Sequence, residues 1–177
     1  VGYYLTIVAG SEVAFARSIP QLAEDFRSVR PTVIVSVPRI YEKVMARVRE
    51  KVAAAPPLRQ KLFAFAETTG RAVFDAQQAG ESVSPFLALK YQIADRLVLH
   101  TVRAGLGGNI RIAVSGGAAL PKEIGLFFGS MGLTILEGYG LTETSPVVTS
   151  KLLSIEDWTG TVGLPLPWTE VGVLDDA

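Results

Sequence analysis

The sequence predicts an α/β fold in which a parallel β-sheet is flanked by helices and followed by a β-rich C-terminal tail. Three short runs rich in β-branched and aliphatic residues, at 32–37, 110–114 and 133–136, have the length and composition of strands. Helical patterns separate these runs, and strands that are joined by helical crossovers pair in parallel. Glycine and proline recur at short intervals after residue 159. We therefore expect an α/β unit at 1–158 and the start of a β-rich unit at 159–177.

Turn and cap residues bound the first elements. We expect a helix over 21–29, with Ser18 near its N-cap, Pro20 in its first turn and Pro31 ending it. The run 32–37 lies between two prolines, which indicates a buried strand. A second helix is expected from Pro38 to the alanine and proline run at 53–57, with an apolar stripe at Ile40, Val44, Val48 and Val52.

Two further helices are predicted before the second strand. The first covers 58–79 and ends at Gly80, and its predicted apolar stripe is Leu62, Phe65, Ala66, Thr69, Ala72 and Val73. The second begins at Ser84-Pro85 and runs to about residue 102, with Lys90, Asp95 and Arg96 facing out. We interpret these helices as one excursion between neighbouring strands. After the second strand, Pro121 and residues 122–131 predict the helix that leads to the third.

Composition excludes several classes of protein. Lys+Arg and Asp+Glu each number 17 in 177 residues, so net charge gives no reason to expect a nucleic-acid partner. The absence of cysteine excludes a disulfide framework and a thiolate metal site. The apolar run 1–9 is about half as long as a membrane span and has no basic region before it. Both ends interrupt predicted structure, so we expect a fragment of a longer protein.

Chemistry-bearing residues follow the second and third strands, where parallel sheets place their ligand sites. Small residues at 115–119 would let the backbone approach a flat ligand, although a plain strand-to-helix turn also uses glycine. In the segment 137–144, Tyr139 between two glycines is suited to stacking on a purine, while Thr142 and Glu143 could serve a phosphate and a hard divalent cation. Taken singly, Tyr139 fits a packed aromatic and Glu143 a solvated cap residue. Their order together favours a nucleotide site.

The motif pair SGGAAL, then EGYGLTETSP about twenty residues later, resembles the AMP-forming acyl-adenylate enzymes, which include acyl-CoA synthetases, luciferases and nonribosomal-peptide adenylation domains. The segments at 36–43, 95–98, 107–111, 127–128 and 160–167 are similar to the bacterial long-chain fatty acyl-CoA synthetase branch. This resemblance extends over essentially the whole chain. It implies an internal piece of the large N-terminal domain of an ATP-dependent long-chain fatty acid–CoA ligase, with 1–158 carrying the adenylate-binding core.

The resemblance also implies roles for individual residues. Gly116, Gly117 and Ala118 would line the adenine pocket, Tyr139 would stack on the ring, and Gly138 would contact the adenylate or the acyl carbonyl. Thr142 would bind the α-phosphate, Glu143 would ligate Mg²⁺, and Glu137 and Gly140 complete the binding segment. The implied small molecules are ATP or AMP, Mg²⁺, CoA and a fatty acid. The implied location is cytoplasmic, and peripheral association with the inner membrane is left open.

Several alternatives stay open at this point. The parent could adenylate an aryl or amino acid, or could be a nucleotide-binding module without catalysis. The family's phosphate loop, ribose-binding aspartate and C-terminal lysine are expected outside this chain, so the chain alone should be inactive. The run 33–37 and Ala113 could line an acyl tunnel, but we favour sheet core. Trp168 departs from the family's pattern and is expected to be core rather than a junction contact, and His100 is expected to be structural or on the surface.

Overall fold

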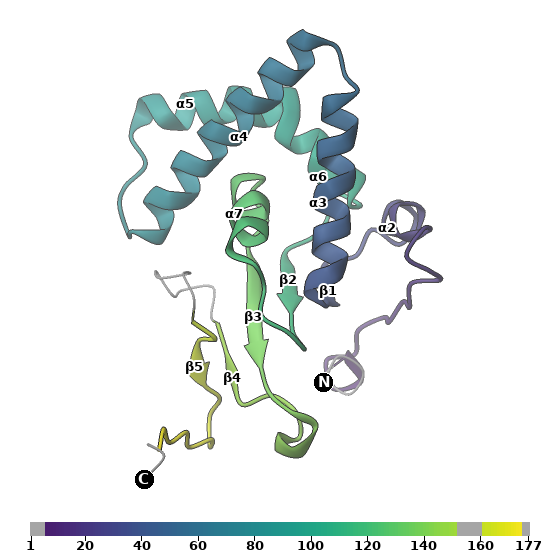
Figure 1. The fold of residues 1–177 in the computed structure, drawn as a ribbon, viewed down its shortest axis with the longest axis vertical. Helices are drawn as coiled ribbons and strands as arrows, with labels where there is room; N and C mark the ends of the chain where they lie inside the picture. The colour runs from purple at the N-terminus through teal and green to yellow at the C-terminus, as the bar shows by residue number, and fades with distance from the viewer. Residues whose placement is uncertain (1–5, 152–160, 175–177) are drawn as a thin grey trace.

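The computed structural model describes residues 6–151 and 161–174, and its centre is a five-stranded sheet in the order β1-β2-β3-β4-β5 (Figure 1). Strands β1 (Val33–Ser36), β2 (Ile112–Ser115) and β3 (Ile135–Tyr139) pair in parallel. Strands β4 (Thr149–Ser150) and β5 (Leu164–Pro165) extend the sheet as antiparallel pairs. The predicted α/β class with a parallel sheet is therefore confirmed. The division at 158/159 falls within residues outside the described part and stays a prediction.

Helices connect the parallel strands as crossovers. After α2 (Leu22–Val29) and β1, the chain forms α3 (Pro38–Ala53), α4 (Pro57–Gln78), α5 (Pro85–Ala94), the π-helical segment η1 (Asp95–Leu99) and α6 (His100–Gly105) before it reaches β2. Helix α7 (Lys122–Ser130) then links β2 to β3. The predicted single excursion between neighbouring strands is confirmed. In Figure 1, α4 and α5 lie at one end of the molecule, while the arrowheads of β2 and β3 point towards the other end.

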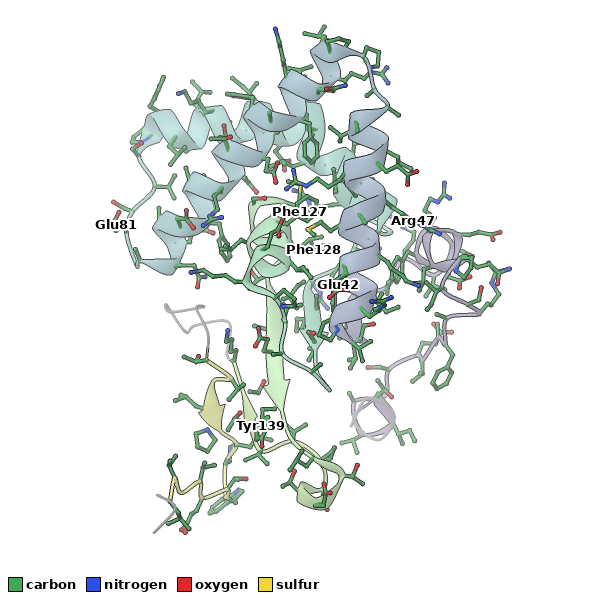
Figure 2. All side chains as sticks on the ribbon, viewed as in Figure 1. Glu42, Arg47, Glu81, Phe127, Phe128 and Tyr139 are labelled. Atoms are coloured by element: carbon green, nitrogen blue, oxygen red, sulfur yellow. The ribbon has the colours of Figure 1, made fainter. Side chains whose placement is uncertain are left out.

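Aromatic residues fill the core between the sheet and the helices that cover it. Phe128 of α7 makes edge-on contacts with Tyr41 of α3 and with Phe127, at ring-centroid distances of 5.6 and 5.3 Å. The Tyr41 hydroxyl donates a hydrogen bond to the carbonyl of Val114 at 2.9 Å, and burial raises the pKa of this hydroxyl. This bond fixes α3 against β2. Figure 2 shows Phe127 and Phe128 together in the middle of the molecule.

Two details of the predicted helices are wrong. Ser18 does not cap the first helix, because its hydroxyl lies 2.9 Å from the side-chain oxygen of Gln21 and the helix begins only at Leu22. In α4 the buried residues are Phe63, Ala66, Thr69, Gly70, Val73 and Phe74, whereas Phe65 and Ala72 are exposed. The buried stripe is rotated because α4 packs on α5 and on α7 at once. Helix α5 begins at Ser84-Pro85 as predicted, and the Ser84 hydroxyl caps it by accepting a hydrogen bond from the Leu87 amide at 3.3 Å.

The expected burial of the first strand is also wrong in part. Val33, Val35 and Val37 are exposed, to 61% for Val35, whereas Ile34 packs on the core. Successive residues of a strand face opposite sides, and the valines lie on the opposite side of β1 from the core-facing Ile34. Trp168, expected in the core, is fully exposed with φ 69°. In the part of the chain that the structure describes, no helix is long and apolar enough to cross a bilayer.

Candidate adenylate site

The sheet register brings the two candidate segments together. Ser115 at the end of β2 lies opposite Ser36 of β1 on one side and Glu137 of β3 on the other. The next amide, that of Gly116, donates to the Ser36 carbonyl at 3.1 Å. A Cβ placed on Gly116 would lie 3.5 Å from the carbonyl oxygen of Gly138. The segments 115–119 and 137–140 therefore lie side by side at the carboxyl edge of the parallel strands, where α/β sheets bind ligands.

The first segment leaves β2 as an open backbone turn. Gly117 has φ +80°, a conformation that residues with a Cβ rarely adopt, and its nearest neighbour would be a methyl group of Val37. Gly117 and Ala118 are exposed, whereas Gly116 is half-buried. Small residues here keep the edge of β1 and β2 accessible to a flat ligand.

The second segment differs from its prediction in secondary structure. Glu137, Gly138 and Tyr139 are the last residues of β3 and do not form a loop after the strand. The Tyr139 carbonyl accepts a hydrogen bond from the Val148 amide at 2.8 Å, which ties β3 to the start of β4. The Tyr139 side chain is 46% exposed, at the end of β3 close to β4 and β5 (Figure 2). The ring is thus held by a paired strand and retains an exposed surface on which a ligand can stack.

The chain after Tyr139 makes a tight loop that ends at Pro146. Gly140 has no room for a side chain, because a Cβ there would overlap the Pro146 carbonyl. The 3₁₀ turn η2 (Thr142–Thr144) presents Thr142 and Glu143, both exposed. The Thr144 hydroxyl accepts from the Leu141 amide at 2.9 Å and lies 2.9 Å from the carbonyls of Leu141 and Pro146.

Thr144 is therefore the residue that holds the loop closed, a role that the sequence reasoning missed. The signal was present in the sequence. A threonine three residues after the start of a short helical turn commonly bonds back to the backbone at that start.

Two polar side chains at the ends of β2 and β3 are withdrawn from solvent, Ser115 fully and Glu137 partly. The Ser115 hydroxyl is 1% exposed and has no hydrogen-bond partner among the described residues. Burial raises the pKa of Glu137, and the charge of the buried Lys151 partly offsets this rise. The Glu137 carbonyl also accepts from the Lys151 amide at 2.9 Å. Glu137 is thus tied to Lys151, directly after β4, through a backbone hydrogen bond and through charge, which favours a supporting role for its side chain.

The loop can bind a magnesium ion only if a bound ligand supplies further oxygen atoms. Within the described ranges, no group of three or more His, Cys, Asp or Glu side chains lies close enough together to hold a metal. Glu143 offers one exposed carboxylate, with the Thr142 hydroxyl beside it in sequence. Mg²⁺ commonly binds one or two carboxylates and takes its other oxygens from water and substrate phosphates. The donor set is therefore adequate for a magnesium–nucleotide complex and too small for a metal site of the protein alone.

Comparison with known proteins shows what this chain is similar to. The chain is 41% identical over 167 residues to the proteins named long-chain-fatty-acid–CoA ligase FadD15 of Mycobacterium bovis and of Mycobacterium tuberculosis. These matches cover 93% of this chain and 27% of each relative. Long chain acyl-CoA synthetase 2 of Arabidopsis thaliana is 34% identical over 170 residues, which are 95% of this chain and 24% of the plant protein.

The chain thus spans about a quarter of the length of these relatives. Among solved structures, a benzoate CoA ligase from Burkholderia xenovorans LB400 is 26% identical, with a TM-score of 0.46 over 87% of this chain and 21% of that one. The sequence pattern of the AMP-binding enzyme family matches residues 1–177. The chain belongs to the AMP-binding enzyme family.

Proposed function

We propose that this chain is the central part of the large N-terminal domain of an ATP-dependent long-chain fatty acid–CoA ligase. The observation that carries the proposal is the contact between the ends of β2 and β3, which joins the glycine segment to the segment that bears Tyr139, Thr142 and Glu143. Family membership supports the nucleotide. The names of the relatives support a fatty acid and CoA as the other substrates.

The adenine would lie against the glycine segment. Gly116, Gly117 and Ala118 leave backbone free to approach the base, and the half-exposed ring of Tyr139 supplies a stacking surface. Gly138 leaves room at the end of β3 for the adenylate or the acyl carbonyl. Glu137 supports the segment from behind, and Gly140 permits the tight loop that follows.

The α-phosphate would lie over η2. Thr142 would donate its hydroxyl to a phosphate oxygen, and Glu143 would hold Mg²⁺ together with the phosphates. The ion, when bound, would offset the negative charge that develops at phosphorus. In the first half-reaction, a carboxylate oxygen of the fatty acid attacks the α-phosphorus and the bond to pyrophosphate breaks. In the second, the CoA thiol attacks the acyl carbonyl, its proton is lost and AMP leaves with the electrons of the broken C–O bond.

The rest of the enzyme is part of the same proposal. The phosphate loop, the ribose-binding aspartate and the lysine of the C-terminal domain would lie outside these residues, so the 177-residue chain alone should not form acyl-CoA. We place the parent enzyme in the cytoplasm with peripheral association to a membrane, because a long-chain fatty acid partitions into lipid.

Exchange of pyrophosphate into ATP by the full-length protein tests the proposal. Glu143→Ala should reduce exchange by roughly a hundredfold or more and raise the magnesium concentration needed, because electrostatic groups at a transition state commonly contribute that much. Glu81→Ala, which removes an exposed carboxylate in the turn between α4 and α5 (Figure 2), is the matched control and should exchange like the wild type. Unchanged exchange in Glu143→Ala would refute the metal role. Absence of exchange in the wild type would instead favour a module that binds nucleotide without catalysis.

The same assay with a panel of acids tests the substrate class. Long-chain fatty acids should support faster exchange than benzoate, other aryl acids or amino acids. A preference for aryl or amino acids would overturn the fatty-acid assignment and leave the adenylate site intact.

A further inference from the structure

The loop between β3 and β4 carries Thr142 and Glu143 on the 3₁₀ turn η2, beyond the arrowhead of β3 (Figure 1). The side chains of Thr142 and Glu143 form no hydrogen bond or ion pair with a residue in the described part of the chain. The backbone of η2 therefore sets where both side chains point. The amides of Thr144 and Ser145 close the turn, at 3.1 and 3.3 Å from their carbonyl acceptors. These bonds hold it weakly, because 3₁₀ geometry aligns hydrogen bonds poorly.

The Thr144 hydroxyl fastens this turn to both sides of the loop. It accepts a hydrogen bond from the Leu141 amide at 2.9 Å. It also lies 2.9 Å from the carbonyl oxygens of Leu141 and Pro146, and its one proton is donated to either of them. Leu141 precedes η2 and Pro146 follows it. One hydroxyl thus joins the backbone before the turn to the backbone after it.

The ends of the loop are fixed, but the turn between them is not held by packing. At the entry, the Tyr139 carbonyl is paired with the Val148 amide at 2.8 Å, as part of the β3–β4 ladder. Residues 141–146 are all exposed in the described part of the chain. Ser145 has φ 59°, a left-handed conformation that is unfavourable for a residue with a Cβ. Loss of the Thr144 hydroxyl would therefore leave the turn free to rearrange and would relieve this strain.

We propose that Thr144 is a positioning residue for adenylation, whose hydroxyl holds Thr142 and Glu143 in the orientation that receives the α-phosphate and magnesium. This role rests on the proposed function, because Thr142 and Glu143 are assigned to the nucleotide there. A misplacement of about 1 Å can cost roughly a hundredfold in rate, so a residue that touches neither ligand can still control the reaction. A hydroxyl that only stabilised the loop would change unfolding and leave nucleotide binding as it is.

Three variants of the full-length protein test this role. Thr144→Val removes the hydroxyl and keeps the branched shape, whereas Thr144→Ser keeps the hydroxyl and removes the methyl group. Thr68→Val is the matched control. Thr68 is exposed on α4, and its hydroxyl also donates to a backbone carbonyl, that of Ala64 at 2.8 Å.

Two measurements apply to each variant: calorimetric titration with Mg·ATP in the absence of fatty acid, and pyrophosphate exchange at a series of magnesium concentrations. Thr144→Val should bind Mg·ATP several-fold more weakly. It should exchange roughly tenfold or more slowly and need more magnesium for half-maximal exchange. Its KM for the fatty acid should stay at the wild-type value, because the hydroxyl acts on the phosphate side of the site. Thr144→Ser and Thr68→Val should behave like the wild type.

Several results would overturn the role of Thr144. Wild-type binding and exchange in Thr144→Val would do so, and so would an equal loss in Thr144→Ser, which would assign the effect to the methyl group. A Tm of Thr144→Val well below that of the wild type, or failure of this variant to fold, would show that the hydroxyl stabilises the fold as a whole and would also overturn it.

The two measurements separate this role from the proposed function. Absence of exchange in the wild type would refute the ligase. If the wild type then still bound Mg·ATP and Thr144→Val bound it more weakly, the role of Thr144 in holding the phosphate side would stand. Absence of Mg·ATP binding by the wild type would refute both.

Discussion

The contact between α4 and α7 at Gly70 gives a prediction about stability. For Gly70→Ala, helix propensity and the folded structure predict changes of opposite sign in the free energy of unfolding. By helix propensity alone, Gly70→Ala in the middle of a 22-residue helix should stabilise the protein by about 1 kcal/mol. In the folded chain, however, a Cβ on Gly70 would overlap the backbone carbonyl of Ser130, the last residue of α7. The close approach of the two helices therefore requires glycine at this position.

The size of the expected loss of stability depends on which part of the structure must move to make room for the new methyl group. The obstructing atom belongs to the backbone, and Ser130 is buried, so a side-chain rotation cannot relieve the overlap. Helix α7 would have to shift, and it carries the buried Phe127 and Phe128. Overpacking of this kind costs about 1–3 kcal/mol, and we expect the upper part of that range here. After the gain in helix propensity, the net loss should be roughly 1–2 kcal/mol.

Urea unfolding of this chain, followed by the circular dichroism of its helices, measures the difference. Gly105→Ala is the matched control, because Gly105 ends α6 and a Cβ there would meet nothing within 4 Å. That variant should be unchanged or up to about 1 kcal/mol more stable. If Gly70→Ala is as stable as the wild type or more stable, the close approach of α4 and α7 described above is wrong.

Four further substitutions, one of them a control, test other parts of the fold in the same unfolding experiment. Ser84→Ala should cost about 1 kcal/mol, because it removes the cap on the Leu87 amide, whereas Ser18→Ala should have no measurable effect. Phe128→Ala should cost about 3–5 kcal/mol, since the ring is 3% exposed and packs on two other rings; a loss below about 1 kcal/mol would contradict that packing. Because the pKa of Glu137 is raised in the folded state, its contribution to stability is complete below pH 4.5 and is lost as the pH rises through the folded-state pKa. Glu137→Gln should therefore stabilise the protein at neutral pH. The variant should also show a weaker dependence of stability on pH.

Local signals in the sequence predicted the type and order of the elements well. The proline and serine at 84–85 placed the start of α5, and the β-branched run at 32–37 placed β1 to within one residue at each end. These features depend on backbone preferences and caps, which act over a few residues. The strand–helix–strand order then required parallel pairing, so the neighbouring positions of the two site segments also followed from the sequence.

The burial of individual side chains could not be predicted from local sequence signals, because it depends on which helices and strands pack together. Phe65 and Phe74 both lie in α4, and only the packing of α5 and α7 decides that Phe74 is buried and Phe65 exposed. The same holds for Trp168, whose size suggested core and whose position in a turn leaves it exposed. Periodicity identifies an apolar face of a helix, but more than one face of the same helix can be apolar.

The same distinction between local sequence signals and tertiary contacts applies to the residues of the candidate adenylate site. The sequence by itself determined which side chains could serve a nucleotide, since Tyr139, Thr142 and Glu143 carry the required chemistry in a recognisable order. Only the tertiary structure decided that Tyr139 belongs to a strand paired with β4 and how much of its side chain stays exposed. Side-chain chemistry is a property of each residue and is visible in the sequence, whereas the fit of backbone against backbone arises only when segments distant in the sequence come into contact.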